Sequence, residues 1–317
     1  MERELALEFV RVTESAALAA APFMGRGDKN GVDKAAVEAM RKAFDNVDID
    51  GTVVIGEGEI DEAPMLYIGE KVGSGSSLKV DIAVDPIEGT TIVSKGLPNG
   101  IAVLAAASGG SFLHAPDMYM DKLVVGPGAK GVIDITKPIE ENIIKVAESL
   151  GKRVQDMTVA ILDKPRHKER IENIRKLGCR INIFPDGDVA MAIATATEEP
   201  TVDLLTGIGG APEGVIAAAA LKCLGGDMQA ILKPRNEEEI QRAKEMGILD
   251  IERTYNIDEL AKGEDIFFAA TGITGGELLK GVRVKNNIAK TFSLIMRAKT
   301  GTVRYVNAIH NLDKKPL

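Results

Sequence analysis

The second half of the chain alternates short apolar segments with longer amphipathic ones, and this pattern constrains the fold more than any other feature. Apolar runs of strand length are each followed by a loop and by a segment with helical spacing. The four pairs are 157–162 with 167–177, 180–184 with 189–196, 202–206 with 212–224, and 228–232 with 237–246. Such alternation predicts a doubly wound, largely parallel sheet, whose ligands gather at the carboxyl ends of the strands.

The first half of the chain has a different pattern. Apolar residues recur at helical spacing from Leu5 to Ala19, before Pro22, and again over residues 32–44. Further strands are expected at residues 51–55, 78–84, 101–107 and 266–270, with strands or hairpins over residues 281–309. We therefore expect an α/β protein of two domains: an α+β metal-binding domain over residues 1–151 and an α/β substrate-binding domain over residues 152–317.

Composition excludes several classes of protein. With 317 residues, of which 45% are hydrophobic, the chain can form two cores, and its net charge of −8 argues against a general binder of nucleic acid or anionic membranes. Cys179 and Cys223 lack the spacing of a metal pair, and we interpret them as buried apolar residues in a reducing cytoplasm. No apolar run reaches membrane-spanning length and the acidic N-terminus does not suit a secretory signal, so we expect a soluble, cytoplasmic protein.

The strand expected at residues 78–84 leads directly into Asp85-Pro86-Ile87-Glu88-Gly89-Thr90-Thr91. Asp85 and Glu88 lie three residues apart, so one helical-type turn can bring both carboxylates together, and they would repel each other unless a cation lay between them. Pro86 is expected to end the strand, and Gly89 allows the backbone to approach a ligand closely. The segment therefore predicts a site for a divalent metal and a phosphate; the alternative is that its side chains merely cap the next helix.

Three other carboxylates lie where predicted elements begin or end, and such positions can converge in the fold. Asp33 is near the start of a predicted helix, Glu57 lies between two glycines, and Glu213 follows Gly-Gly-Ala-Pro. Alternatively, Asp33 could complement a helix dipole and Glu213 could be an ordinary first-turn acid after a proline. The acids in the loop after Glu57 are interpreted as solvated rather than as ligands; they are Glu59, Asp61 and Glu62.

The segment from Asp85 to Thr91 resembles the Asp-Pro-x-Asp/Glu-Gly-Thr signature of the metal-dependent, often lithium-sensitive sugar and inositol phosphatases. More narrowly, residues 3 to about 310 resemble class II fructose-1,6-bisphosphatases. The resemblance rests on several ordered blocks, which are Thr13-Glu14-Ser15-Ala16, Gly25-Arg26-Gly27-Asp28-Lys29-Asn30, Gly56-Glu57-Gly58-Glu59, Lys164-Pro165-Arg166-His167, Asp186-Gly187-Asp188 and Gly207-Ile208-Gly209-Gly210-Ala211-Pro212-Glu213-Gly214. It implies the layered α/β/α/β/α sugar phosphatase fold.

The resemblance also implies a metal site. Its ligands would be Asp33, Glu57, Asp85, Glu88 and Glu213. Because this shell contains only oxygen atoms, it suits Mg²⁺ or Mn²⁺, and five carboxylates can bind more than one ion. The three histidines, His114, His167 and His310, are scattered and offer no zinc site.

For catalysis, the resemblance implies that Thr90 helps to hold or deprotonate the attacking water. Because a threonine is not a strong base, Glu88 and the metal must supply the basicity. Lys29 matches a position near the reacting centre. The implied substrate-binding positions are Glu88, Gly89, Thr90, Tyr119, Lys164, Pro165, Arg166, Asp186, Gly187, Asp188 and Gly210. Among them, the guanidinium of Arg166 suits bidentate binding of a phosphate.

The sequence also contains a repeated Lys-Pro-Arg motif and a glycine-rich segment. Lys164-Pro165-Arg166 recurs as Lys233-Pro234-Arg235, each after a predicted strand and before a charged helix, as expected of equivalent loops in one sheet. The alternative is that both are ordinary surface charges at a helix start. The glycine-rich residues 207–214 follow a strand, but they lack the Gly-x-Gly-x-x-Gly spacing of dinucleotide-binding proteins, and the chain has no P-loop motif. Binding of NAD or ATP is therefore not expected.

The activity implied by the resemblance is hydrolysis of the 1-phosphate of fructose 1,6-bisphosphate by metal-activated water, without a phospho-enzyme, in gluconeogenesis. One alternative keeps the chemistry but changes the substrate to sedoheptulose 1,7-bisphosphate or to an inositol or other sugar monophosphate. Another is a non-catalytic sensor of sugar phosphates or nucleotides. Similarity also implies a homo-oligomer, either a dimer or a tetramer.

Overall fold

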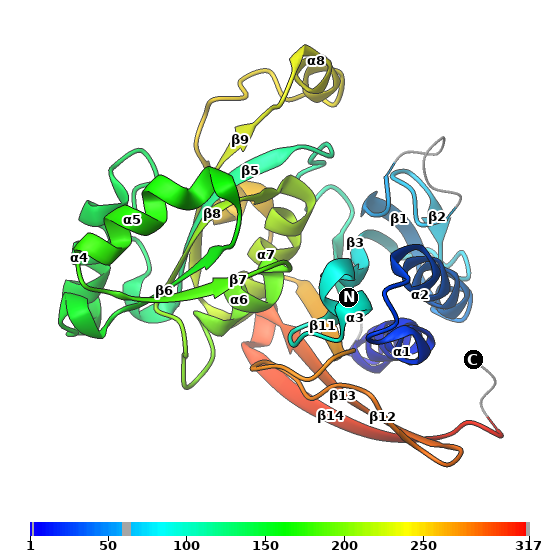
Figure 1. Cartoon of the computed structure of the whole chain (residues 1–317). Helices are drawn as coiled ribbons and strands as arrows, with labels where there is room; N and C mark the ends of the chain where they lie inside the picture. Colours follow the sequence, from blue (N-terminus) through cyan, green and yellow to red (C-terminus); the bar gives the residue numbers. More distant parts are fainter. Residues whose placement is uncertain (2, 59–64, 315–317) are drawn as a thin grey trace. The chain divides into compact units, whose positions relative to one another are not determined.

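The computed structural model describes Met1, residues 3–58 and residues 65–314, so the acidic Glu59, Asp61 and Glu62 lie outside the described residues. The chain forms two compact units (Figure 1). The first unit is Met1–Phe112 with Gly263–Leu317, and the second unit is Leu113–Lys262. This division differs from the expected one at residues 151 and 152. The reason is that β11 (Ile266–Gly272) pairs antiparallel with β4 (Ile101–Ser108), which returns the C-terminal part of the chain to the first unit.

The first unit contains an eight-stranded sheet in the order β12-β13-β11-β4-β3-β1-β2, with β14 paired to β13. The remaining strands are β1 (Asp50–Ile55), β2 (Lys71–Val72), β3 (Lys79–Glu88), β12 (Arg283–Lys285), β13 (Ile288–Arg297) and β14 (Thr302–Asn311). Only β1 and β3 pair in parallel among the described strands of this sheet. The predicted α+β character of the N-terminal part is confirmed.

Helices α1 (Leu5–Ala20) and α2 (Lys29–Phe44) pack against each other, and α1 also packs on β11 and β13 (Figure 1). The aromatic rings of Phe9 and Phe267 meet edge to face in this core, with centroids 5.8 Å apart. Helix α2 begins three residues earlier than predicted, because the Asp28 side chain accepts a hydrogen bond from the Gly31 N–H at 2.8 Å and caps the helix. Asp33 therefore lies beyond the first turn.

Strand β3 does not end at Pro86 as predicted but continues to Glu88. In its pairing with β4, Asp85 lies opposite Val103 and Glu88 opposite Ile101, so three steps along β3 match two along β4. The extra residue is a β-bulge, and a bulge tolerates proline because an unpaired residue needs no ladder N–H. A bulge, rather than a helical turn, therefore spaces the two carboxylates. The short helix α3 (Thr90–Lys95) follows.

The second unit contains a six-stranded sheet in the order β10-β9-β5-β8-β6-β7. Its strands are β5 (Tyr119–Val125), β6 (Thr158–Leu162), β7 (Arg180–Phe184), β8 (Leu204–Gly210), β9 (Asp227–Lys233) and β10 (Tyr255–Asn256). The four predicted strands, β6 to β9, run in one direction, but β5 lies antiparallel between β8 and β9 and β10 is antiparallel to β9. The sheet is therefore mixed rather than largely parallel. The prediction was wrong on this point because β5 was not recognised as a strand.

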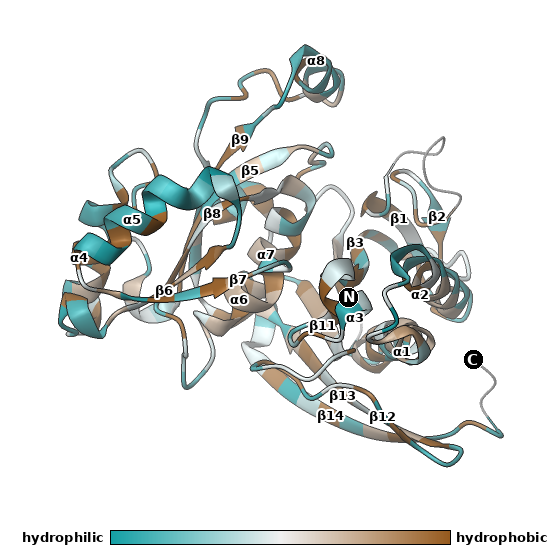
Figure 2. Cartoon of the chain, viewed as in Figure 1, coloured by the Kyte–Doolittle hydropathy of each residue, from teal (hydrophilic) through white to brown (hydrophobic). Residues whose placement is uncertain are grey.

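Helices of very different polarity surround this second sheet. They are α4 (Ile139–Leu150), α5 (Lys168–Lys176), α6 (Asp188–Ala194), α7 (Ala211–Leu224), α8 (Glu237–Glu245) and α9 (Ile257–Leu260). Figure 2 shows α5 and α8 as largely hydrophilic, whereas α7 is rich in alanine and almost entirely buried. A helix that is apolar on all sides is a core helix, and the buried part of α7 runs without a break over residues 214–221.

The α/β class is confirmed by the two sheets and their helices, while the order of all five layers remains a prediction. Cys179 and Cys223 are both buried, as interpreted from the sequence. Within the described ranges, no helix has both the length and the apolar character needed to cross a membrane.

Candidate active site

The bulge of β3 holds two carboxylates close together in the first unit. One carboxylate oxygen of Asp85 and one of Glu88 lie within 4.8 Å of each other. Glu88 is only 3% exposed, and Asp85 Oδ1 accepts a hydrogen bond from the Ile87 N–H at 2.9 Å, which orients it within the bulge. Because two like charges at this distance repel, the pair fits the donor set of a hard divalent cation.

The turn after the bulge carries the hydroxyl groups of Thr90 and Thr91, and the ammonium of Lys29 contacts the second of them. Gly89 adopts φ +91°, a left-handed conformation that glycine reaches without steric cost, and it caps α3 without a side chain. Thr90 Oγ1 donates to the Ile87 carbonyl at 3.3 Å, so Thr90 is not the helix-capping residue of the alternative interpretation. Lys29 Nζ donates to Thr91 Oγ1 at 2.9 Å, which brings the start of α2 to the start of α3.

The other two predicted ligands of the first unit, Asp33 and Glu57, are not among the carboxylates whose oxygens lie within 4.8 Å of one another. Asp33 is partly buried, and burial raises the pKa of its carboxyl group above the usual value. Its position beyond the first turn of α2 removes the helix-dipole explanation. Glu57 follows β1, and its backbone N–H donates to the Leu66 carbonyl at 3.0 Å.

The second unit brings Asp188 and Glu213 to a lysine that the sequence analysis did not single out. Lys122, on β5, lies with its Nζ 2.5 Å from Asp188 Oδ2 and donates to the Gly210 carbonyl at 2.8 Å. Asp188 begins α6, whereas Glu213 lies in the first turn of α7. The only sequence signal for Lys122 is the adjacent charged pair Asp121-Lys122 inside an otherwise largely apolar run, which is usually taken as evidence against a buried strand.

Two carboxylate oxygens of this group are buried without a hydrogen-bond partner among the described residues: Asp188 Oδ1 and Glu213 Oε2. Burial raises the pKa of Glu213; the positive charge of Lys122 opposes this shift and the negative charge of Asp188 adds to it. A buried acceptor left unpaired by the protein is uncommon in folded proteins and is usually satisfied by a bound water, an ion or a ligand. Glu213 Oε2 thus fits a cation, and Asp188 Oδ1 fits a hydrogen-bond donor.

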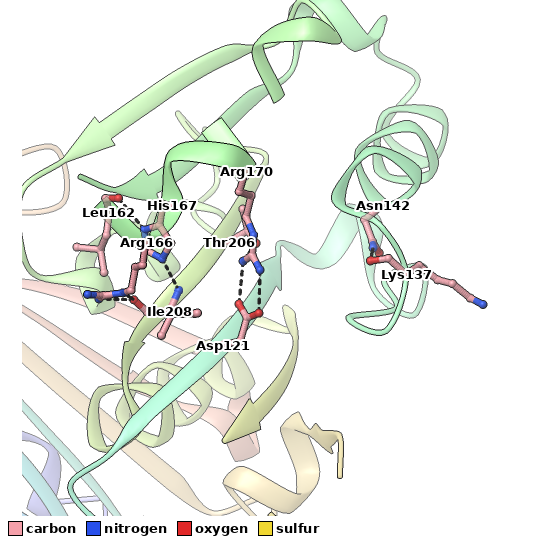
Figure 3. A network of polar contacts seen from close by, with 9 residues as sticks. All are labelled: Asp121, Lys137, Asn142, Leu162, Arg166, His167, Arg170, Thr206 and Ile208. Atoms are coloured by element: carbon pink, nitrogen blue, oxygen red, sulfur yellow. Dashed lines mark hydrogen bonds and ion pairs between the residues drawn. The ribbon is translucent and has the colours of Figure 1, made fainter. Parts of the chain in front are cut away.

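A second part of this unit presents arginines to an aromatic ring. The Arg166 guanidinium carbon lies 4.6 Å from the centroid of the Tyr119 ring, and that of Arg235 lies 5.2 Å from it. Arg166 also donates to the Ile208 carbonyl from Nε and Nη2, at 3.0 and 2.6 Å (Figure 3). Arg235 is ion-paired with Glu239. The repeated Lys-Pro-Arg motif therefore corresponds to two loops that meet on one tyrosine.

Buried polar contacts hold the loop that carries Lys164 and Arg166 (Figure 3). The Ile208 N–H donates to His167 Nε2 at 2.8 Å, so Nδ1 carries the proton and donates to the Leu162 carbonyl, also at 2.8 Å. Burial lowers the pKa of His167 and keeps its ring neutral, in keeping with a structural role. Pro165 lies between the two cationic residues in a 3₁₀ turn (Pro165–His167).

Arg170 and Asp121 form a further buried anchor beneath this loop (Figure 3). Two hydrogen bonds of 2.8 Å join the guanidinium to the carboxylate, and Thr206 Oγ1 accepts a third at 3.0 Å.

The predicted substrate-binding residues Asp186 and Gly187 follow β7. Asp186 lies in the bend before α6, and Gly187 adopts φ +74° there. The predicted positions of the second unit thus lie at the ends of β5, β6, β7 and β8.

Comparisons with known proteins identify the family of the chain. The model of the family described as bacterial fructose-1,6-bisphosphatase, glpX-encoded, matches residues 3–310. The chain is 52% identical over 328 aligned positions to fructose-1,6-bisphosphatase 1 class 2 of Escherichia coli (strain K12), with 99% of this chain and 97% of that protein covered. It is 51% identical over 326 positions to the class 2 fructose-1,6-bisphosphatase of Haemophilus influenzae, with 99% and 98% covered.

Among solved structures, the inositol monophosphatase from Anabaena sp. PCC 7120 matches with a TM-score of 0.31 and 13% identity, over 61% of this chain and 71% of that one. The two sequence comparisons cover nearly the whole chain, and they confirm the family that the Asp-Pro-x-Glu-Gly-Thr segment indicated. The chain therefore belongs to the bacterial, glpX-encoded fructose-1,6-bisphosphatase family, whose members are metal-dependent phosphoric monoester hydrolases.

Proposed function

We propose that this protein hydrolyses the 1-phosphate of fructose 1,6-bisphosphate to fructose 6-phosphate and inorganic phosphate, as a step of gluconeogenesis in the cytoplasm. The observation that carries this proposal is the Asp85–Glu88 pair in the bulge of β3, within a chain 52% identical to a protein named as a class 2 fructose-1,6-bisphosphatase. Hydrolysis of a phosphate ester requires an activated water and neutralisation of the phosphate charge. Carboxylates that hold divalent ions meet both requirements.

Mg²⁺ or Mn²⁺, with more than one ion bound, would supply an activated water and positive charge at the phosphate. The proposed ligands are Asp33, Glu57, Asp85, Glu88 and Glu213. The spacing of Asp85 and Glu88 supports this set, as does the buried, unpaired Oε2 of Glu213. Thr90 would hold the attacking water through Oγ1, and Glu88 would accept its proton. Lys29, fixed by Thr91, would place an ammonium near the reacting phosphate.

The second phosphate and the sugar need contacts of their own. Arg166 and Lys164 would bind the phosphate that is not cleaved, and the hydroxyl of Tyr119 would donate to it. Asp186 and Asp188 would accept hydrogen bonds from sugar hydroxyls. The exposed guanidinium of Arg166 on the Tyr119 ring and the unpaired Oδ1 of Asp188 support these roles. The remaining proposed contacts are backbone or turn positions: Glu88, Gly89, Thr90, Pro165, Gly187 and Gly210.

A phosphate-release assay with and without divalent metal tests the proposal. We expect fructose 1,6-bisphosphate to be hydrolysed fastest from a panel that includes sedoheptulose 1,7-bisphosphate and inositol 1-phosphate, and we expect EDTA to remove the activity. Mn²⁺ or Mg²⁺ added in excess of EDTA should restore it. A different preferred substrate would replace the specificity assigned here, and binding of sugar phosphates without phosphate release in either metal would favour a sensor.

We propose further that the protein is a homo-oligomer, a dimer or tetramer, in which β14 meets β14 of a second copy. β14 pairs only with β13 among the described strands, so its other edge leaves backbone N–H and C=O groups open. Tyr305 is 61% exposed and Ile309 is 70% exposed on this strand. Long, apolar edge strands favour pairing with another chain, and antiparallel pairing about a two-fold axis is self-complementary.

Light scattering coupled to size-exclusion chromatography tests this interface. The variant carrying Tyr305→Lys and Ile309→Lys is expected to elute with a smaller molar mass than the wild type, because like charges would face each other across the two-fold axis. Leu249→Lys, at an apolar residue of the second unit that is 84% exposed, serves as the control and should not change the mass. An unchanged molar mass in the double variant would exclude β14 as the interface.

A further inference from the structure

The glycine-rich residues 207–214 do not bind a dinucleotide by spacing, and the proposed function uses only Gly210 and Glu213 among them. We infer that Gly209 and Gly210 make room for the buried Lys122 and its carboxylate neighbours, that Gly214 makes room for Met120 beside them, and that Lys122 is a positioning residue that orients Asp188 and the start of α7. This inference rests on the proposed function, and every residue that it uses belongs to the second unit.

Lys122 is unusual in its burial. It is 1% exposed, and it stands in the middle of β5, between β8 and β9. An ammonium inside a protein is strongly disfavoured unless it is paired and hydrogen-bonded. Lys122 meets this condition with two contacts, the Asp188 carboxylate at 2.5 Å and the Gly210 carbonyl at 2.8 Å. These contacts join β5 to the first residue of α6 and to the N-cap of α7.

The glycines around this lysine are explained by space rather than by backbone conformation. Gly209, Gly210 and Gly214 are not among the glycines with positive φ. A Cβ at Gly209 would overlap Asp188 Oδ2 and lie 3.0 Å from Lys122 Nζ, and a Cβ at Gly210 would overlap Glu213 Oε2. At Gly214 it would lie 2.5 Å from Met120 Sδ and 3.5 Å from Lys122 Cδ. The segment therefore accommodates the lysine and both carboxylates.

Lys122 carries one positive charge beside two buried carboxylates, so it cannot pair with all of their oxygen atoms. One ammonium faces two carboxylates, those of Asp188 and Glu213. Lys122 holds Asp188 through Oδ2, which leaves Oδ1 buried and unpaired for a sugar hydroxyl. Its bond to the Gly210 carbonyl holds the start of α7, from which Glu213 extends with Oε2 also unpaired. Lys122 thus fixes both side chains without occupying the oxygens that a ligand needs.

The test is a double-mutant cycle on the full-length, Mn²⁺-loaded protein with fructose 1,6-bisphosphate. Lys122→Met, which keeps the length of the side chain, is expected to raise KM by at least about 10-fold and to lower kcat less, because Asp188 loses its orientation. Asp188→Asn should have a similar effect. The double variant should be no worse than the poorer single variant, within about threefold, because both changes remove one contact. Multiplied effects in the double variant, or an unchanged KM in Lys122→Met, would overturn the inference.

Lys152 provides a matched control within the same unit. Its Nζ pairs with the buried Asp203 at 2.6 Å, so Lys152→Met also removes the ammonium partner of a buried carboxylate, but at a site that the proposed function does not use. This variant should keep its KM within about threefold of the wild type, even where its stability falls. If Lys152→Met raises KM as much as Lys122→Met does, the effect of Lys122 is merely structural and the positioning role is wrong.

Urea unfolding of the four proteins of the cycle covers the case in which Lys122→Met folds poorly. Removing both charges should raise the unfolding midpoint above that of Lys122→Met alone, because Asp188 is no longer an unpaired buried charge. No recovery in the double variant would overturn the ion pair. The wild-type assay separates the two proposals: phosphate release by the wild type with an unchanged KM in Lys122→Met refutes only the role of Lys122. An inactive wild type refutes the proposed function. The urea unfolding midpoints of the four proteins then show whether the Lys122–Asp188 ion pair exists.

Discussion

Asp85→Ala is expected to lower kcat for fructose 1,6-bisphosphate by more than about 100-fold. Loss of a residue that only hydrogen-bonds to a metal ligand already costs about 10- to 100-fold, and loss of a ligand itself should cost more. The substitution removes one member of the carboxylate pair in the β3 bulge, and both members are proposed metal ligands. The measurement is kcat at saturating and at limiting Mn²⁺. We expect saturating metal to restore only part of the activity.

Two companion variants isolate the role of the charge. Asp85→Asn keeps an oxygen that can accept the Ile87 N–H, so it should preserve the bulge but lose activity to a similar extent. Asp81→Asn, on the same strand, alters a buried carboxylate that accepts from the Ser111 and Phe112 N–H groups at 2.8 and 3.3 Å. This control should reduce stability and keep kcat within about threefold. Wild-type turnover of Asp85→Ala at both metal concentrations would refute the ligand role.

Local patterns in the sequence predicted most helices and strands. The main strand that they missed is β5. The span of β5 contains Asp121 and Lys122, two charged residues that a buried strand normally excludes. In the fold, Asp121 pairs with Arg170 and Lys122 with Asp188, and both partners come from later helices. Pairing makes the burial tolerable, but it depends on contacts between residues far apart in the chain. Periodicity alone does not reveal such contacts.

The division into units was missed for the same reason. The strand expected at residues 266–270 is present as β11, but its partner β4 is more than half the chain away. A change of pattern near Gly151 indicated where a series of strands and helices begins, not which sheet the last strands would join. Strand pairing is non-local, so a boundary inferred from composition and rhythm along the chain does not determine it.

The candidate site was predictable to the extent that its residues are neighbours in sequence. Asp85 and Glu88 lie close together as expected, although a β-bulge rather than a helical turn spaces them. Gly89 and the hydroxyl of Thr90 belong to the same local motif, but the left-handed conformation of Gly89 was not predicted. Lys122 could not be inferred, because its role depends on the glycines of a segment that becomes its neighbour only after folding. The pairing of buried charges is therefore the part of the site that only the structure shows.

Arg166→Ala is expected to raise the KM for fructose 1,6-bisphosphate by about 30-fold while changing the hydrolysis of inositol 1-phosphate by less than about threefold. The guanidinium is proposed to bind the phosphate that is not cleaved, and losing a charge-assisted contact of this kind costs about 2 kcal/mol or more. A monophosphate lacks that group and should not respond. Arg166→Lys keeps the charge but not the planar pair of donors, so its KM should fall between those of the wild type and Arg166→Ala.

Arg235 supplies the matched control, because it stacks on the same Tyr119 ring at 5.2 Å but is ion-paired with Glu239. Arg235→Ala is expected to change KM for the bisphosphate by less than about threefold, since its guanidinium is paired with Glu239 and is not proposed to bind the second phosphate. Equal losses for both arginine variants would mean that the pair acts through the tyrosine ring. Equal losses of Arg166→Ala on the bisphosphate and the monophosphate would mean that Arg166 supports the fold of its loop, through the Ile208 carbonyl, rather than a second phosphate.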